Sequence, residues 1–208
     1  MREVQSCIVI MYNKSFEYFE VYQQQIGKAL AGIRSESYGT AYETIKHAGT
    51  ISASIFVCGN GGSASIAEHF SCDHSKGVHM DTKTLRPNIV SLASNMAVIT
   101  AIGNDIGYDR IFSKQLEFSS ADSSDILVAV SSSGNSPNIL NALDVANDRN
   151  MVSIALVGFD GGAAARKADI VVHVNSDNYG IVEDCHQIIM HSWAQCLRIS
   201  ESVNHIKL

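Results

Sequence analysis

Apolar residues in the first part of the chain recur with the spacing of a helix. From Phe16 to Ile33 they lie mostly three or four positions apart, which predicts an amphipathic helix, and a second helix is expected over Glu36–His47. Five short runs rich in isoleucine and valine follow, and each predicts a buried strand. These runs are Ile51–Val57, Asn88–Leu92, Ile126–Val130, Val152–Val157 and Asp169–Val174.

Helical segments are predicted around and between these strands. Strands that alternate with helices favour an α/β fold, in which a mostly parallel sheet has helices on both faces and right-handed crossovers. We predict one domain over residues 1–208, with a helical N-terminal segment (1–50) and an α/β core (51–208). The predicted core helices are Ser63–Ser75, Met96–Ile102, Tyr108–Phe118, Pro137–Asn150, Gly162–Lys167 and Gly180–Ser200.

Two glycine- and serine-rich turns follow the first and third predicted strands, at Gly59–Ser63 and Ser131–Ser136. Ligands of such sheets bind beyond the carboxyl ends of the strands, where both turns are expected. Glycines allow close approach of the backbone, serines offer hydroxyl donors, and a helix N-terminus favours an anion. Ser136 and Pro137 also suit the N-cap and first residue of a helix. The pair of turns therefore predicts a ligand that carries both a phosphate and hydroxyl groups.

Composition narrows the class of protein. Hydrophobic residues make up 46% of the 208 positions and charged residues 17%, which is typical of a compact globular chain. The net charge of −6 argues against a nucleic-acid partner, and no apolar stretch approaches the roughly 20 residues of a membrane span. The five cysteines include no C-x-x-C pair, so we expect reduced thiols and a cytoplasmic location.

Histidines and carboxylates on two predicted helices could carry chemistry. His69 and Asp73 are four positions apart and share a helix face, which suits either metal ligation or an acid/base pair. On the last helix, Asp184 is only about 20° out of line with His191, whereas Glu183 is rotated by about 80° and lies about 12 Å away along the axis. Geometry alone favours Asp184 as the partner of His191. A metal between Glu183 and His191 could still be reached by both side chains.

Several motifs occur in a fixed order along the chain. They are Gly59-Asn60-Gly61-Gly62-Ser63, His69-Phe70, Gly103-Asn104-Asp105, Ser131-Ser132-Ser133-Gly134-Asn135-Ser136, Gly158-Phe159-Asp160-Gly161-Gly162 and His191. From about Phe16 to Ser200, the chain resembles the sugar isomerase (SIS) domain and, within it, the phosphoheptose isomerase branch.

The resemblance implies a fold, an activity and an assembly. It implies a flavodoxin-like five-stranded sheet and a homotetramer whose N-terminal helices join subunits and whose active sites lie between them. It implies isomerisation of sedoheptulose 7-phosphate to D-glycero-D-manno-heptose 7-phosphate through an enediol, for the heptose of surface polysaccharides. It also implies Zn²⁺, one ion per subunit. The implied substrate-binding residues are Asn60, Ser63, Asp105, Ser131, Ser132, Ser133 and Ser136, and Glu183 is expected to join them.

The chain departs from the family pattern at three positions. Asp73 stands where the family has glutamate, Glu183 where it usually has glutamine, and Gly180 where it has a substrate-binding aspartate. Together with His69 and His191, Asp73 and Glu183 still make a plausible zinc set. Asp73 is a candidate for base or metal ligand, and His191 for catalytic acid or metal ligand. Because one residue cannot easily serve both roles at once, these assignments are alternatives.

Two other functions are compatible with the resemblance. Gly180 and Glu183 favour an SIS isomerase that acts on another sugar phosphate. A non-enzymatic SIS module that binds the bacterial replication initiator is the second alternative. It is disfavoured because a scaffold has no need of His191 and its carboxylates.

Overall fold

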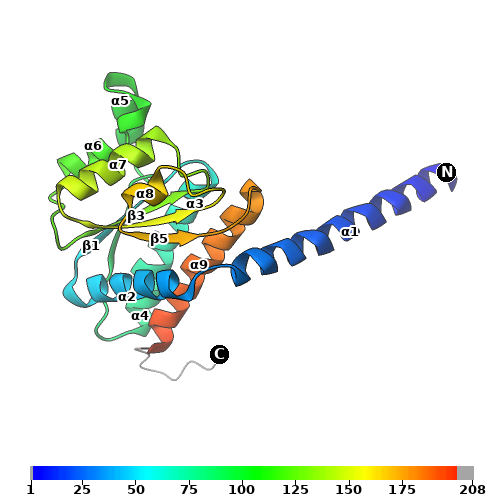
Figure 1. Cartoon of the computed structure of the whole chain (residues 1–208), viewed down its shortest axis with the longest axis horizontal. Coiled ribbons are helices and arrows are strands. Elements are labelled where there is room, and N and C mark those ends of the chain that lie inside the picture. The colour runs from blue at the N-terminus through cyan, green and yellow to red at the C-terminus, as the bar shows by residue number, and fades with distance from the viewer. Residues whose placement is uncertain (1, 201–208) are drawn as a thin grey trace.

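The chain begins with two helices, α1 (Arg2–Ala31) and α2 (Ser35–Ile51). The computed structural model describes the backbone of residues 2–200 and the side chains of residues 14–200, so Cys7 lies outside the described side chains. Both predicted N-terminal helices are present, and α1 begins well before Phe16. In Figure 1, α1 projects away from the rest of the molecule, and only its C-terminal part approaches the body.

Five parallel strands form the sheet in the order β2-β1-β3-β4-β5, which is the flavodoxin-like order. The prediction of a parallel α/β sheet is confirmed. The strands are β1 (Ser54–Gly59), β2 (Asn88–Ser91), β3 (Ile126–Ser131), β4 (Val152–Val157) and β5 (Ile170–His173).

Helices cover both faces of the sheet because alternate strand residues point to opposite sides. Val128 packs in a core with α2, α3 and α9, whereas Leu127 packs in a second core with α5, α6, α7 and α8. Figure 1 shows these two helical layers on either side of the strands. The helices are α3 (Gly62–Cys72), α4 (His79–Asp81), α5 (Met96–Asp105), α6 (Ser113–Phe118), α7 (Pro137–Asp148), α8 (Ala164–Lys167) and α9 (Tyr179–Ser200).

The structure corrects the predicted start of the first strand. Ile51 is the last residue of α2, and Ser52 ends that helix in the left-handed conformation with φ of 56°. β1 begins only at Ser54. An apolar residue at the end of a helix cannot be told from one at the start of a buried strand by hydrophobicity alone.

Two predicted helices are irregular. The segment predicted as a helix over Ser63–Ser75 ends as α3 at Cys72 and continues through a π-helical turn, η1 (Asp73–Val78), into α4. The segment predicted over Tyr108–Phe118 divides into a 3₁₀ turn, η2 (Tyr108–Arg110), and α6. Within the described residues, no helix combines the length and the apolar character needed to cross a membrane.

Candidate active site

The turn after β3 is a rigid serine-rich loop. The amide of Gly134 donates to the carbonyl of Ser131, and Gly134 has a positive φ of 64°. A Cβ at Gly134 would lie 2.1 Å from the carbonyl oxygen of Gly161, so only glycine fits this approach. The loop after β4 supports the turn, since Gly158 donates to the carbonyl of Ser132. The backbone of this turn is therefore held in place independently of any ligand.

Ser136 and Pro137 occupy the positions that the sequence predicts. Ser136 is the N-cap of α7 and Pro137 follows at its start, although the Ser136 hydroxyl makes no capping hydrogen bond. That hydroxyl therefore stays free of the helix and lines the adjoining pocket. The N-terminus of α7 adds a favourable dipole for an anion.

A reciprocal pair of amides joins the two turns. Asn60 donates from Nδ2 to Oδ1 of Asn138 at 2.8 Å, and Asn138 donates back to Oδ1 of Asn60 at 2.8 Å. The hydroxyl of Tyr108 also donates to Oδ1 of Asn60, at 3.1 Å. The side chain of Asn60 thus fixes the first turn against α7. Neither Asn138 nor Tyr108 was predicted from the sequence, because the fold brings them to Asn60.

The two turns enclose a polar pocket of about 150 Å³. Ser132 is 5% exposed, and its Oγ has no hydrogen-bond partner among the described residues. A buried unpartnered hydroxyl is costly unless a ligand satisfies it, which indicates a preformed binding site. The pocket is lined by Asn60, Ser63, Val130, Ser131, Ser132, Ser133, Ser136, Tyr179 and Glu183.

A second cluster lies where α3 and η1 meet α9. Oδ1 of Asp73 is 3.5 Å from Nε2 of His69, and Oδ2 is 3.5 Å from Nε2 of His191. The two imidazole rings meet edge to face, with centroids 4.7 Å apart. One ligand atom from each of these three residues lies within 4.8 Å of the other two, so the group could hold a metal ion. Two imidazoles and one carboxylate suit a zinc site that leaves a position open for substrate.

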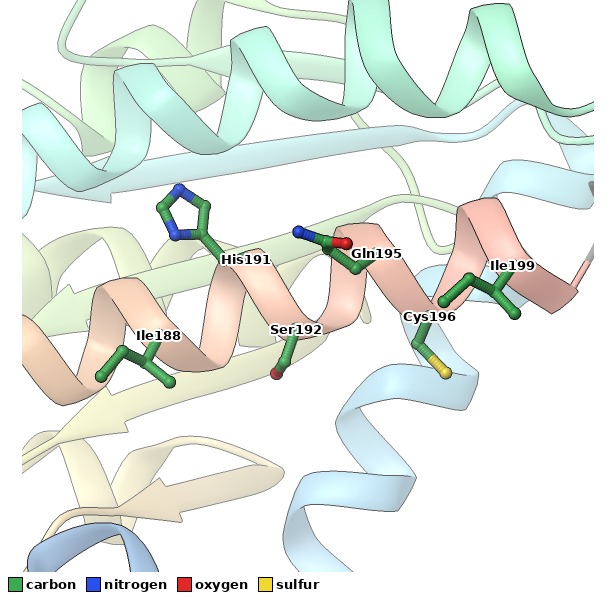
Figure 2. A pocket seen from close by; sticks show the side chains of 6 residues that line it. All are labelled: Ile188, His191, Ser192, Gln195, Cys196 and Ile199. Carbon is green, nitrogen blue, oxygen red and sulfur yellow. The ribbon is translucent and has the colours of Figure 1, made fainter. Parts of the chain in front are cut away.

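Gln187 and an apolar groove flank His191. Nε2 of Gln187 lies 2.9 Å from Nε2 of His191, one helical turn along α9. The same ring nitrogen therefore has the Gln187 amide and the Asp73 carboxylate as neighbours. Figure 2 shows His191 and Gln195 on one side of α9, and Ser192 and Cys196 on another, along a groove of about 590 Å³.

Asp184 is not the partner of His191, which corrects the expectation from helical geometry. Asp184 accepts a hydrogen bond from the hydroxyl of Tyr22 on α1 at 2.8 Å. Burial, followed by this contact, raises the pKa of Tyr22 to about 12. Two residues seven positions apart point the same way but are about 10.5 Å apart along the axis, so alignment does not bring them into contact. The neighbouring helix supplies the carboxylate of Asp73 instead.

Glu183 and Asp105 lie away from the histidine cluster. Glu183 points into the serine pocket, where its carboxylate covers Gly62 so closely that a Cβ there would lie 2.2 Å from Oε2. The group of His69, Asp73 and His191 does not include it. Asp105 is exposed at the end of α5, accepts a hydrogen bond from Asn104, and is not among the residues that line the serine pocket.

A family model described as the SIS domain matches residues 17–158, a range that contains the turn after β1, His69, Asp73 and the serine turn. The chain belongs to the SIS domain family. The earlier resemblance is thereby confirmed.

Several proteins that are similar to this chain carry the name phosphoheptose isomerase. The phosphoheptose isomerase of Helicobacter pylori (strain ATCC 700392 / 26695) is 32% identical over 86% of this chain and 91% of its own length. That of Aliarcobacter butzleri (strain RM4018) is 35% identical over 86% of this chain and 93% of its own length. The solved structure of the phosphoheptose isomerase of Neisseria gonorrhoeae has a TM-score of 0.80, with 30% identity, over 90% of this chain and 98% of that one.

Proposed function

We propose that this SIS-family chain is a phosphoheptose isomerase, a ketose–aldose isomerase that converts sedoheptulose 7-phosphate to D-glycero-D-manno-heptose 7-phosphate. The arrangement of the site carries the proposal. The serine pocket lies at one end of α9 and the histidine cluster lies about 12 Å further along that helix, measured from Glu183 to His191. A long open-chain sugar phosphate can place its phosphate in the pocket and its reacting carbons at the cluster.

The serine pocket supports phosphate binding. Ser131, Ser132, Ser133 and Ser136 bring four hydroxyl groups to one small cavity, and the Ser132 hydroxyl is ready to donate. Hydrogen bonds to a charged phosphate oxygen are stronger than those between neutral groups. Holding the phosphate fixes the distant carbons as well, which lowers the entropic part of the reaction barrier.

Proton transfer is the chemical task of the histidine cluster. A base must move a proton between C1 and C2, and an acid or a cation must stabilise the enediol oxygen. In this proposal Asp73 serves as base or metal ligand, and His191 as acid or metal ligand. With zinc bound, His69, Asp73 and His191 would hold it, and the ion would act as a Lewis acid at the substrate oxygens.

Proton NMR with sedoheptulose 7-phosphate, with and without a chelator, tests the proposal. We expect turnover that the chelator abolishes. Absence of turnover with the heptulose, accompanied by turnover of another ketose phosphate, would contradict the substrate. Turnover that is unaffected by complete metal removal would assign Asp73 and His191 to acid/base catalysis without a metal.

Zinc binding has a separate test that does not depend on activity. Metal analysis of protein purified without a histidine tag is expected to find about one ion per subunit, since the cluster has one set of ligands. His69→Ala should lose the ion. Metal retained in that variant would remove His69 from the ligand set.

The proposal includes a homotetramer with active sites between subunits. Exposed apolar side chains on α1 support it, as does the groove beside His191, which Ile188, Cys196 and Ile199 help to line. Light scattering should show a tetramer, and Phe16→Ser combined with Phe19→Ser should dissociate it. A monomeric wild-type protein would contradict the assembly.

The proposed cellular role is to supply heptose for surface polysaccharides from the cytoplasm. It rests on the phosphoheptose isomerase activity. Deletion of the coding sequence should remove heptose from the surface polysaccharide of the source cell, and a plasmid copy should restore it. Unchanged polysaccharide composition would contradict this role and leave the enzymatic activity standing.

A further inference from the structure

An aromatic residue that lines the serine pocket is packed against a second aromatic ring. Tyr179 is the first residue of α9, is 57% exposed and lines the pocket. Its ring packs against that of Phe159, with centroids 4.7 Å apart and planes inclined by 55°. Phe159 in turn lines a separate cavity. The ring contact therefore links a residue of the serine pocket to a residue of a second cavity.

The backbone of Phe159 is held in an unfavourable conformation. Its φ is 49°, in the left-handed region that bulky side chains rarely adopt. Two hydrogen bonds secure this conformation: the amide of Phe159 donates to the carbonyl of Ser176 at 2.8 Å, and its carbonyl lies 2.9 Å from Nε2 of His173. Strain of this kind is kept where the surrounding structure enforces it, often beside a functional site. Here it presents the Phe159 ring to Tyr179.

Tyr179 and Glu183 provide two chemically different surfaces to the pocket. They are four positions apart on α9 and share a face. The Glu183 carboxylate lies over Gly62 and makes no hydrogen bond among the described residues, so it can accept bonds from sugar hydroxyls. Tyr179 instead offers an aromatic ring, which packs well on C–H groups. A polyol chain between the two residues would direct its hydroxyl groups toward Glu183 and its C–H groups toward Tyr179.

We propose that Tyr179, supported by Phe159, is a specificity-determining residue that packs against the carbon chain next to the phosphate ester. The pocket then favours phosphate monoesters of an extended polyol over inorganic phosphate. This inference rests on the proposed phosphate site of the isomerase. It concerns binding of the non-reacting part of the substrate, so it can be measured without turnover.

Calorimetric titration with sorbitol 6-phosphate and with inorganic phosphate tests the proposal. Tyr179→Ala should weaken binding of sorbitol 6-phosphate about tenfold, because apolar contact area is lost, and leave the affinity for inorganic phosphate within about twofold. Tyr179→Phe keeps the ring and should bind both ligands as the wild type does. Phe118→Ala, at an exposed aromatic residue on α6 outside the pocket, is the matched control.

The variant Phe159→Gly tests whether Phe159 supports the ring of Tyr179 or only contributes to the stability of the fold. Glycine adopts the left-handed conformation readily, so relief of backbone strain offsets part of the packing lost with the ring, and the variant should remain folded. Its affinity for sorbitol 6-phosphate should nevertheless fall, as in Tyr179→Ala. A stable Phe159→Gly variant with wild-type affinity would overturn the supporting role.

Two further outcomes overturn the proposal for Tyr179. Equal losses of affinity for both ligands in Tyr179→Ala would mean that the residue acts on the phosphate itself, and unchanged affinities would mean that it is not part of the binding surface. Failure of the proposed function looks different. In that case wild-type protein binds sorbitol 6-phosphate with the expected dependence on Tyr179, yet does not isomerise sedoheptulose 7-phosphate.

Discussion

The serine pocket and the histidine cluster lie along the same helix but are built in different ways. Four of the serines that line the pocket come from one continuous turn, Ser131–Ser136, whose backbone is fixed by hydrogen bonds to itself and to the loop after β4. The cluster joins His69 and Asp73 to His191 from a helix far along the chain, and contacts between side chains connect them. The pocket is therefore preformed, whereas the cluster depends on how two helices pack.

Removing a histidine from the cluster should have the largest effect. His191→Ala removes the catalytic acid or a metal ligand, so we expect kcat/KM to fall about 10³-fold. Loss of bound metal in the same variant would assign His191 as a ligand, and retained metal would assign it as the acid. Gln195→Ala, on the same side of α9 in Figure 2, is the control and should keep both activity and metal. NMR kinetics measure kcat/KM, and metal analysis measures the bound ion. Near-normal activity in His191→Ala would exclude the cluster as the centre of the reaction.

Disrupting the backbone of the serine turn should damage the fold as well as binding. Gly134→Ala brings a Cβ into the carbonyl of Gly161 at a residue with positive φ, so we expect a loss of about 3 kcal/mol in the free energy of unfolding. Urea denaturation measures it. Gly27→Ala, where a Cβ on α1 meets no neighbour, is the control. Equal stability of the two variants would show that the turn is not rigid.

Removing one hydroxyl from the preformed pocket should affect binding but not stability. Ser132→Ala deletes a buried donor that has no partner among the described residues, so phosphate binding should weaken about tenfold. Without ligand, the variant should be as stable as the wild type or slightly more stable. Calorimetry with inorganic phosphate and urea denaturation measure the two quantities. A marked loss of stability together with unchanged binding would make Ser132 a structural residue.

A buried histidine on α9, the helix that carries His191, should show the smallest effect, through pH. His186 on α9 is fully buried, and burial lowers its pKa from 6.5 to about 4. The unfolded state therefore binds more protons than the folded state between these two pH values. The contribution of His186 to the free energy of unfolding is fully present above pH 6.5 and falls on the order of 1 kcal/mol per pH unit toward pH 4. His186→Leu should reduce this slope in urea denaturation series. An unchanged slope would place the acid sensitivity elsewhere.

Much of the fold could be predicted from the sequence because its signals are local. Runs of isoleucine and valine marked all five strands, and β4 has the predicted bounds, Val152–Val157. The start of β1 was misplaced, because Ile51 is equally suited to the end of a helix. The π-helical turn η1, which packs against α9, was not predicted because no local motif in the sequence marks it.

The candidate site was likewise predicted only in part. The serine turn was predicted because Ser136 and Pro137 mark a helix start and the glycines mark a turn. The pairing of Asp184 with His191 was wrong, because helical phase gives direction but not reach. Gln187 was missed although it lies four positions before His191, a spacing that would have been a usable signal. Asn138 was missed although its position early in α7 places it near the second turn.

The sequence alone determined the parallel α/β sheet, the two glycine- and serine-rich turns at its carboxyl edge and the start of the helix that follows the second turn. These follow from hydrophobic period, glycine conformation and helix capping, which act over a few residues. Only the tertiary structure decided that Asp73 stands between two histidines, that Glu183 belongs to the serine pocket, and that Tyr179 closes that pocket against Phe159. Such contacts depend on the relative positions of elements far apart in the chain, which packing of the whole core sets.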